Sequence, residues 1–143
     1  MDMFCYQCEQ TARGQGCDYL GICGKEPEVA ALQDIIVHQA KGVGYLAHQA
    51  RRMGRVDDGA DRYVLEALFT TVTNVNFDPE RLLHWIRRGS EVRDRLLAIC
   101  REAAGRSATP FDEALLPASA TFRPAASRDE LLLQAAAIGI RAD

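Results

Sequence analysis

Four of the five cysteines of this 143-residue chain lie within its first 23 residues, at Cys5, Cys8, Cys17 and Cys23. Their spacing is Cys-x2-Cys-x8-Cys-x5-Cys. Two thiolates separated by two residues can bind one metal centre, because the backbone between them turns and directs its N–H groups toward the sulfur atoms. The glycines of the same segment allow the backbone conformations that such close wrapping requires. The spacing therefore predicts a metal centre with four thiolate ligands.

Three kinds of site can use these thiols. Zinc also binds four thiolates, but typical zinc folds contain two Cys-x2-Cys turns and this chain has one. An iron–sulfur cluster is larger and spreads its ligands further apart, so the irregular spacing favours iron–sulfur over zinc. Disulfides are the weakest interpretation, because the cysteines are crowded at one end of a chain that we expect in a reducing compartment. Arg13 and Lys25 lie in the same segment and are expected to balance part of the cluster's negative charge.

Composition narrows the classes of protein and partner. Seventeen Lys and Arg against 20 Asp and Glu give a formal charge of -3, which argues against a nucleic-acid partner. The length and the 48% of hydrophobic residues predict one globular domain over residues 1–143. The sequence contains no run of 18 apolar residues, so it predicts no membrane-spanning helix. Residues 1–10 also lack the apolar run of a secretory signal. We therefore expect a cytoplasmic protein without a membrane partner.

The cysteine segment, residues 1–26, has no lasting helical or strand period and is predicted to be a cluster-binding loop. A long helix is predicted to begin at Pro27 and to end before Gly54. Gly42 and Gly44 within it are expected to mark the close approach of another backbone or of the cysteine loop. The apolar stripe of this helix comprises Val29, Leu32, Ile36, Ala40, Val43, Ala47 and Ala50.

Two further helices complete a predicted three-helix bundle over residues 27–105. One covers residues 59–75, and its buried side is formed by Val64, Leu68, Thr71 or Val72, and Val75. The start of this helix explains the acidic residues Asp57, Asp58 and Asp61 better than a calcium site does. The next is capped by Asp78 and ends at Gly105. Its apolar stripe comprises Leu82, Ile86, Gly89, Val92, Leu96, Ile99 and Ala103.

Residues 106–143 are expected to form an irregular connection and a short last helix. Pro110, Pro117 and Pro124 predict the irregular part, and Ser127 with Glu130 predicts a capping box for a helix over residues 128–138 that Gly139 ends. The predicted fold is therefore all-α, a three-helix bundle with an N-terminal cysteine-rich cluster-binding loop and a short C-terminal helix.

Other chemically capable residues are interpreted as structural. Cys100 is expected in the core rather than as a fifth ligand. Trp85 is expected as an anchor in the core or at the bundle edge, with an oligomer contact as the alternative. The histidines His38, His48 and His84 are expected at the surface or its boundary, although His38 and Lys41 share a face that could meet the cysteine loop. The arginine pairs are expected on solvated helix faces, with a partner-docking patch as the alternative; they are Arg51 and Arg52, Arg87 and Arg88, and Arg93 and Arg95.

Several long segments resemble the hybrid-cluster (prismane) proteins, also called hydroxylamine reductases. They are CYQCEQT at residues 5–11, GICGK at 21–25, PEVA at 27–30, KGVGYLAH at 41–48 and TNVNFDPER at 73–81. The resemblance covers nearly the whole chain. It implies a helical domain in which Cys5, Cys8, Cys17 and Cys23 bind a cubane 4Fe-4S cluster, since the cysteine spacing is the cubane type of this family and not its 2Fe-2S type.

The chain also departs from that family. Its members are several times longer and bind a hybrid iron–sulfur–oxygen cluster through His, Glu and Cys residues of later domains, none of which can be placed here. His38 also stands where the family has an aromatic residue. The resemblance therefore implies the electron-entry module without the reductase active site.

We expect a small iron–sulfur protein that passes single electrons to a redox partner protein and has no catalytic site of its own. The alternatives are an electron-delivering subunit or fragment of a hydroxylamine-reductase-like enzyme, and a cluster-based sensor or scaffold. A homodimer is also expected, because the surface that packs on later domains in the family would otherwise face water.

Overall fold

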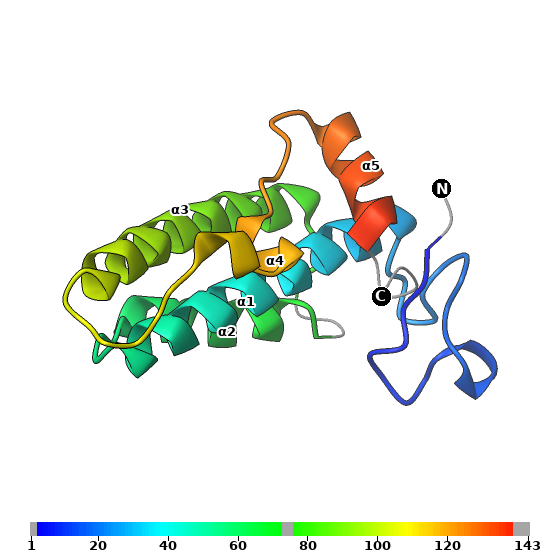
Figure 1. Ribbon diagram of the computed structural model, residues 1–143. Coiled ribbons are helices and arrows are strands. Elements are labelled where there is room, and N and C mark those ends of the chain that lie inside the picture. The colour runs from blue at the N-terminus through cyan, green and yellow to red at the C-terminus, as the bar shows by residue number, and fades with distance from the viewer. Residues whose placement is uncertain (1–2, 73–75, 139–143) are drawn as a thin grey trace.

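The computed structural model describes residues 3–72 and 76–138, which form a group of packed helices with a cysteine-rich N-terminal loop at one end (Figure 1). This confirms the predicted all-α fold. None of the described helices is long and apolar enough to cross a membrane. The α-helices are α1 (Pro27–Arg52), α2 (Asp58–Thr70), α3 (Pro79–Ala104), α4 (Ala118–Thr121) and α5 (Arg128–Ile138), with 3-10 turns at Ala12–Gly14 and Glu113–Leu115.

Helix α1 is the centre of the structure, because α2, α3, α4 and α5 all pack on it (Figure 1). Every residue of its predicted apolar stripe is buried. Ile35, His38 and Leu46 are buried as well, although they lie outside that stripe. A helix that is covered on several sides needs apolar residues around most of its circumference, which explains why the buried surface is wider than one stripe.

Helix α2 differs from its prediction in both its end and its buried face. It ends at Thr70; residues 73–75 of the predicted helix lie outside the described residues. The hydroxyl groups of Thr70 and Thr71 donate to the carbonyl oxygens of Ala67 and Leu68, at 2.7 and 2.8 Å, which favours ending the helix there.

The predicted buried side of α2 is also wrong, because Leu68 is 43% exposed and Val64 is only partly buried. The side chains that face the core are those of Ala60, Tyr63, Ala67 and Thr70. Tyr63 decides this orientation. Its ring inserts above Gly89 of α3, where a Cβ atom would lie 2.3 Å from the tyrosine oxygen. A hydrophobicity pattern alone favours the aliphatic side and misses this fit between a large and a small residue.

The predicted helix starts are confirmed by hydrogen bonds. The carboxylates of Asp57 and Asp78 accept from the backbone N–H groups of Ala60 and Glu80, each at 3.0 Å, and cap α2 and α3. The Ser127 hydroxyl accepts from the N–H of Glu130 at 3.4 Å at the start of α5. The predicted stop of α5 at residue 139 lies outside the described residues.

The connection after α3 is less irregular than predicted, because it contains helix α4. A backbone approach explains Gly42, where a Cβ atom would lie only 2.0 Å from the carbonyl oxygen of Ser119 in α4. The same explanation is wrong for Gly44, since no atom of another described segment lies within 4 Å of its Cβ position.

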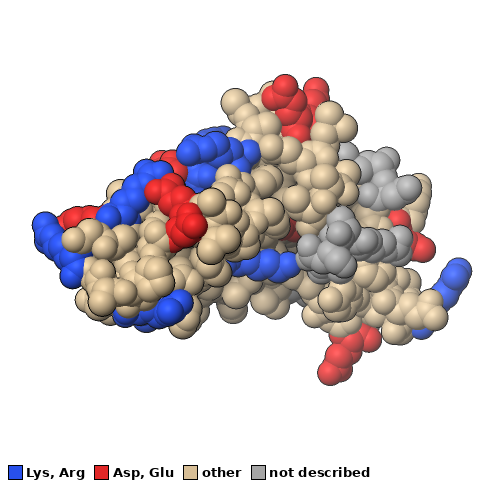
Figure 2. All heavy atoms as spheres, in the orientation of Figure 1, with Lys and Arg blue, Asp and Glu red and all other residues tan. Residues whose placement is uncertain are grey.

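The arginines predicted on solvated faces are mostly paired with acids. Basic and acidic side chains are interleaved along α3 on the face that Figure 2 shows. Arg88 contacts Glu66 at 3.0 Å, and Arg95 contacts Asp57 at 2.7 Å. Arg93 departs from this interpretation, because it is buried and donates to the carbonyl oxygen of Phe122 at 2.6 Å, which ties the connection after α3 to that helix.

The two glycines of α1 give a matched test of the packing between α1 and α4. We expect Gly42→Ala to lower the free energy of unfolding by about 1–3 kcal/mol, because its methyl group collides with backbone that cannot rotate away. Gly44→Ala is expected to raise it by up to about 1 kcal/mol through helix propensity, since the site is open. Urea denaturation followed by circular dichroism measures both changes. Equal effects of the two substitutions would contradict the α1–α4 contact.

Candidate metal centre

The N-terminal loop folds back on itself so that two of the four predicted ligands become neighbours. Cys5 and Cys17 form an isolated antiparallel bridge. The N–H of Cys5 donates to the oxygen of Cys17 at 2.9 Å, and the N–H of Cys17 donates to the oxygen of Cys5 at 2.8 Å. The chain reverses between them through the 3-10 turn Ala12–Gly14. Residues that are twelve apart in sequence are thereby fixed side by side.

A second, tighter turn positions Cys23. The N–H of Gly21 donates to the oxygen of Lys25 at 2.8 Å, and the N–H of Gly24 donates to the oxygen of Gly21 at 2.8 Å. Gly24 has φ +87°, a conformation that side chains disfavour. The Cys23 sulfur lies 3.1 Å from the place where a Cβ atom of Gly21 would stand. Both glycines are therefore needed to hold this thiol on its turn.

The four loop cysteines are free thiols and are not joined in disulfides. Cys17 is buried, and Cys5, Cys8 and Cys23 are half-buried. Across residues 3–72 and 76–138, no three His, Cys, Asp or Glu side chains gather where they could hold a metal ion. Convergence of the four sulfur atoms on one centre therefore stays a prediction. Metal binding commonly supplies the free energy that draws such ligands together.

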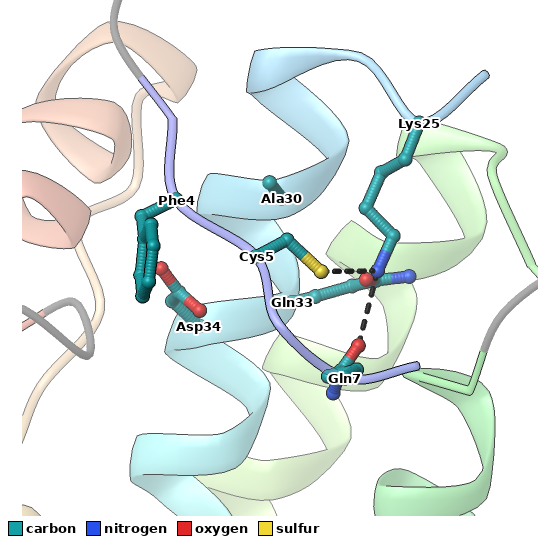
Figure 3. Close-up of a pocket in the computed structure, with 7 residues that line it drawn as sticks. All are labelled: Phe4, Cys5, Gln7, Lys25, Ala30, Gln33 and Asp34. Carbon is teal, nitrogen blue, oxygen red and sulfur yellow. Dashed lines mark hydrogen bonds between the residues drawn. The ribbon is translucent and has the colours of Figure 1, made fainter. Parts of the chain in front are cut away.

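The chemistry of the donor set fits a thiolate-bound cluster. Four unbridged thiols share one loop, and a cation lies beside one of them, Cys5. The Lys25 ammonium group is 3.6 Å from the sulfur of Cys5 and donates to the Oε1 atom of Gln7 at 3.0 Å (Figure 3). Lys25 is 1% exposed, whereas Arg13, the other cation expected to balance the cluster, is exposed.

Asp34 of α1 lines the same small cavity, which has a volume of about 10 Å³ and space for one water molecule (Figure 3). Burial raises the pKa of the Asp34 carboxyl to about 6, and attraction by Lys25 and Lys41 offsets only part of this rise. Gln33 lines the cavity as well, and its Oε1 atom is buried without a hydrogen-bond partner. The loop thus meets α1 across a polar, partly charged contact.

The remaining candidates lie outside this contact. Cys100 is fully buried, contacts the carbonyl oxygen of Leu46 at 3.5 Å and has its pKa raised by burial, so the prediction of a core cysteine is confirmed. His48 and His84 are exposed. His38 departs from the expected surface position, because it is buried in α1 and its ring packs edge-on against Phe122, with the ring centroids 5.0 Å apart. Trp85 is half-buried beside Tyr63, as expected for an anchor at the bundle edge.

Sequence reasoning missed the polar residues at the contact between loop and bundle, namely Gln7 on the loop and Gln33 and Asp34 on α1. One signal was available: Gln33 and Asp34 lie within two turns of the start of α1, next to buried stripe residues, where a surface helix would continue the apolar pattern. Polar residues at such positions indicate a neighbour that needs hydrogen bonds.

Comparison with known proteins gives one consistent result. The model of the Prismane/CO dehydrogenase family matches residues 3–142. The hydroxylamine reductase of Methanocella arvoryzae is 44% identical over 141 residues, which are 99% of this chain and 25% of that protein. The hydroxylamine reductase of Rhodospirillum rubrum is 45% identical over 130 residues, which are 91% of this chain and 23% of that protein. The chain thus spans about a quarter of the length of the curated relatives it matches.

The raised pKa of Asp34 predicts a pH-dependent stability. Between about pH 4 and 6 the folded protein keeps a proton on Asp34 that the unfolded chain has released, so the free energy of unfolding falls as the pH rises through this range. We expect Asp34→Asn to remove this fall, so that at pH 7.5 the free energy of unfolding of the variant is about 1–3 kcal/mol higher than that of the original protein. Urea denaturation at pH 4 and pH 7.5 measures the difference. A constant difference between the two proteins at both pH values would contradict the prediction.

Proposed function

The chain belongs to the Prismane/CO dehydrogenase family, and from this premise we propose that it binds one 4Fe-4S cluster and transfers single electrons. Proteins of this family bind iron–sulfur clusters, and membership supports a redox role based on a metal cluster. The proposed ligands are Cys5, Cys8, Cys17 and Cys23. The observation that carries the proposal is a single loop that presents four unbridged thiols beside a buried cation.

A bound cluster supplies reversible one-electron chemistry. The chain holds it with four thiolates, which leaves no iron position open for a substrate. The Cys5–Cys17 bridge fixes two ligand backbones, the Gly21–Lys25 turn carries a third thiol, and buried Cys17 limits access of water from its side. Free thiols of this kind persist in a reducing cytoplasm, which is the location that the proposal requires.

A second candidate function is supported by the relatives themselves. They are hydroxylamine reductases about four times as long as this chain. In this alternative the chain delivers electrons to a partner, or to a further segment, that carries the catalytic centre. Co-purification with a larger iron–sulfur protein would favour it over a free electron carrier.

Cluster binding is tested by preparing the protein without oxygen and comparing two cysteine variants. We expect equal amounts of iron and sulfide, visible absorption that bleaches reversibly on reduction, and the EPR signal of a reduced cubane. Cys8→Ser is expected to lose most of the bound iron. Cys100→Ala is the matched control and should keep it, because Cys100 lies in the helical core away from the loop.

Three results would decide against the proposal. If the purified protein contains one zinc ion per chain and no iron, the four thiols form a zinc site instead of a cluster site. Equal iron loss in the Cys8 and Cys100 variants would remove the assignment of the ligands. A cluster that never changes its oxidation state, but whose removal melts the loop and abolishes partner binding, would favour the sensor or scaffold.

We also propose that the protein forms a homodimer through the outer face of α2. Three apolar residues of α2 and a fourth just beyond its end project on that side with helical spacing, although the opposite face already packs on α1 and α3. A helix that is apolar on both faces is usually covered on both. In a dimer with two-fold symmetry, the outer face of α2 would pack against the same face of the second copy. The four residues, all more than 40% exposed, are Leu65, Leu68, Phe69 and Val72.

The dimer predicts a specific effect of charge on this face. Phe69→Glu is expected to convert the dimer to a monomer, because it would bury a carboxylate in an apolar interface. Leu133→Glu on α5 is the control, since Leu133 is also exposed but lies outside the α2 face. Light scattering coupled to gel filtration gives the mass of each protein. A strictly monomeric original protein would exclude the homodimer.

A further inference from the structure

Lys25 has an environment that does not suit a buried cation. Its side chain is 1% exposed, although lysine is almost never fully buried unless it is paired with an opposite charge. The ammonium group contacts the thiol of Cys5, the amide oxygen of Gln7 and the ring of Phe77, whose centroid lies 5.8 Å away. None of these three groups is a carboxylate, the usual partner of a buried ammonium group.

Asp34 does not resolve this imbalance. Its carboxyl group lines the same cavity and attracts Lys25 through space, but it makes no ion pair with the ammonium group and so offsets the charge only in part. No carboxylate of the described residues lies within 4.0 Å of the ammonium group, since Lys25 forms none of the ion pairs found there. A buried ammonium group without a close partner is costly, so this arrangement calls for a further negative charge on the side of Cys5.

The chain holds Lys25 firmly in this position. The backbone oxygen of Lys25 closes the turn that carries Cys23, so one turn presents both a proposed ligand and the cation. The amide group of Gln7 links the cation to α2, because its Oε1 atom accepts from Lys25 at 3.0 Å and its Nε2 atom donates to the Thr71 hydroxyl at 3.0 Å. Figure 3 shows the ammonium group between the side chains of Cys5 and Gln7.

We propose that Lys25 is a positioning residue of the cluster site, whose fixed positive charge favours cluster binding and raises the reduction potential of the bound cluster. The inference rests on the proposed function and assigns a role to one residue of that site. Four thiolates give the site net negative charge, and each added electron increases it. A cation buried next to the Cys5 sulfur stabilises the reduced state more than the oxidised state, since the interaction is poorly screened by water. The electron comes from the external reductant, and no proton is transferred in this step.

The experiment compares three substitutions in protein loaded with its cluster under anaerobic conditions. Lys25→Met removes the charge and keeps a similar length, whereas Lys25→Arg keeps the charge. Arg13→Met is the matched control, because Arg13 lies in the same loop but its cation is exposed to water. Equilibration with dyes of known potential gives the ratio of reduced to oxidised cluster, circular dichroism reports the helical bundle, and a competing chelator reports iron retention.

We expect Lys25→Met to shift the ratio of reduced to oxidised cluster at least tenfold toward the oxidised form, which is about 59 mV for one electron. Arg13→Met should shift it less than twofold, and Lys25→Arg should stay close to the original protein. If Lys25→Met keeps its helical signal but no longer holds iron while Lys25→Arg does, the charge is required for binding, which also supports the inference.

The inference is overturned if Lys25→Met holds the cluster with a ratio within twofold of the original. It is also overturned if the Met and Arg variants both lose the cluster, because the role of Lys25 is then one of shape. Failure of the proposed function looks different: the original protein itself would bind no iron–sulfur cluster.

Discussion

The structure depends on the burial of α1 (Pro27–Arg52) by every other described α-helix. A helix enclosed in this way must satisfy the polar groups that it carries inward. The Nε2 atom of Gln39 is satisfied in this way, because it donates to the carbonyl oxygen of Ile86 at 3.1 Å and to the Ser90 hydroxyl at 3.2 Å, both on α3, whereas its buried Oε1 atom has no partner among the described residues. Polar contacts of this kind fix the relative position of two helices more strictly than apolar packing does.

The N-terminal loop is attached to the bundle by a different kind of contact. Its Cys17 belongs to a small apolar cluster with Met3 and Ala30, separate from the main core. The rest of the attachment is polar and involves Gln7 and Lys25 on the loop side. Little apolar area is buried there, so the loop gains less from the hydrophobic effect than the bundle does. The proposed cluster would add the missing stabilisation where the loop needs it.

The sequence predicted those features that depend on local chemistry. The proline and the capping residues placed the starts of the long helices, and the stripes of α1 and α3 followed from their periodicity. Features that depend on the fit between distant segments were missed. Because Tyr63 inserts above Gly89, α2 presents a different face to the core than its hydrophobic pattern predicts. Arg93 is buried because it donates a hydrogen bond to the carbonyl oxygen of Phe122. Neither partner is near in sequence, so no local pattern could reveal them.

The candidate site follows the same division. The four cysteines were identified from their spacing, and Lys25 from its place in the same segment. The receiving residues Gln33 and Asp34 belong to α1 and required the structure. Gly44 shows the opposite error, because a reason was assigned to a glycine beside which the structure leaves open space.

The position of the loop makes the two ends of the molecule different. The loop adjoins the first turns of α1, and the 26 residues of this helix extend about 39 Å to its other end (Figure 1). Electron tunnelling weakens steeply with separation, so a redox partner bound near Arg52 would be electronically isolated from the thiols. Under the proposed function, exchange of electrons would be confined to one tip of the molecule, and the distant end would serve contacts that carry no electrons.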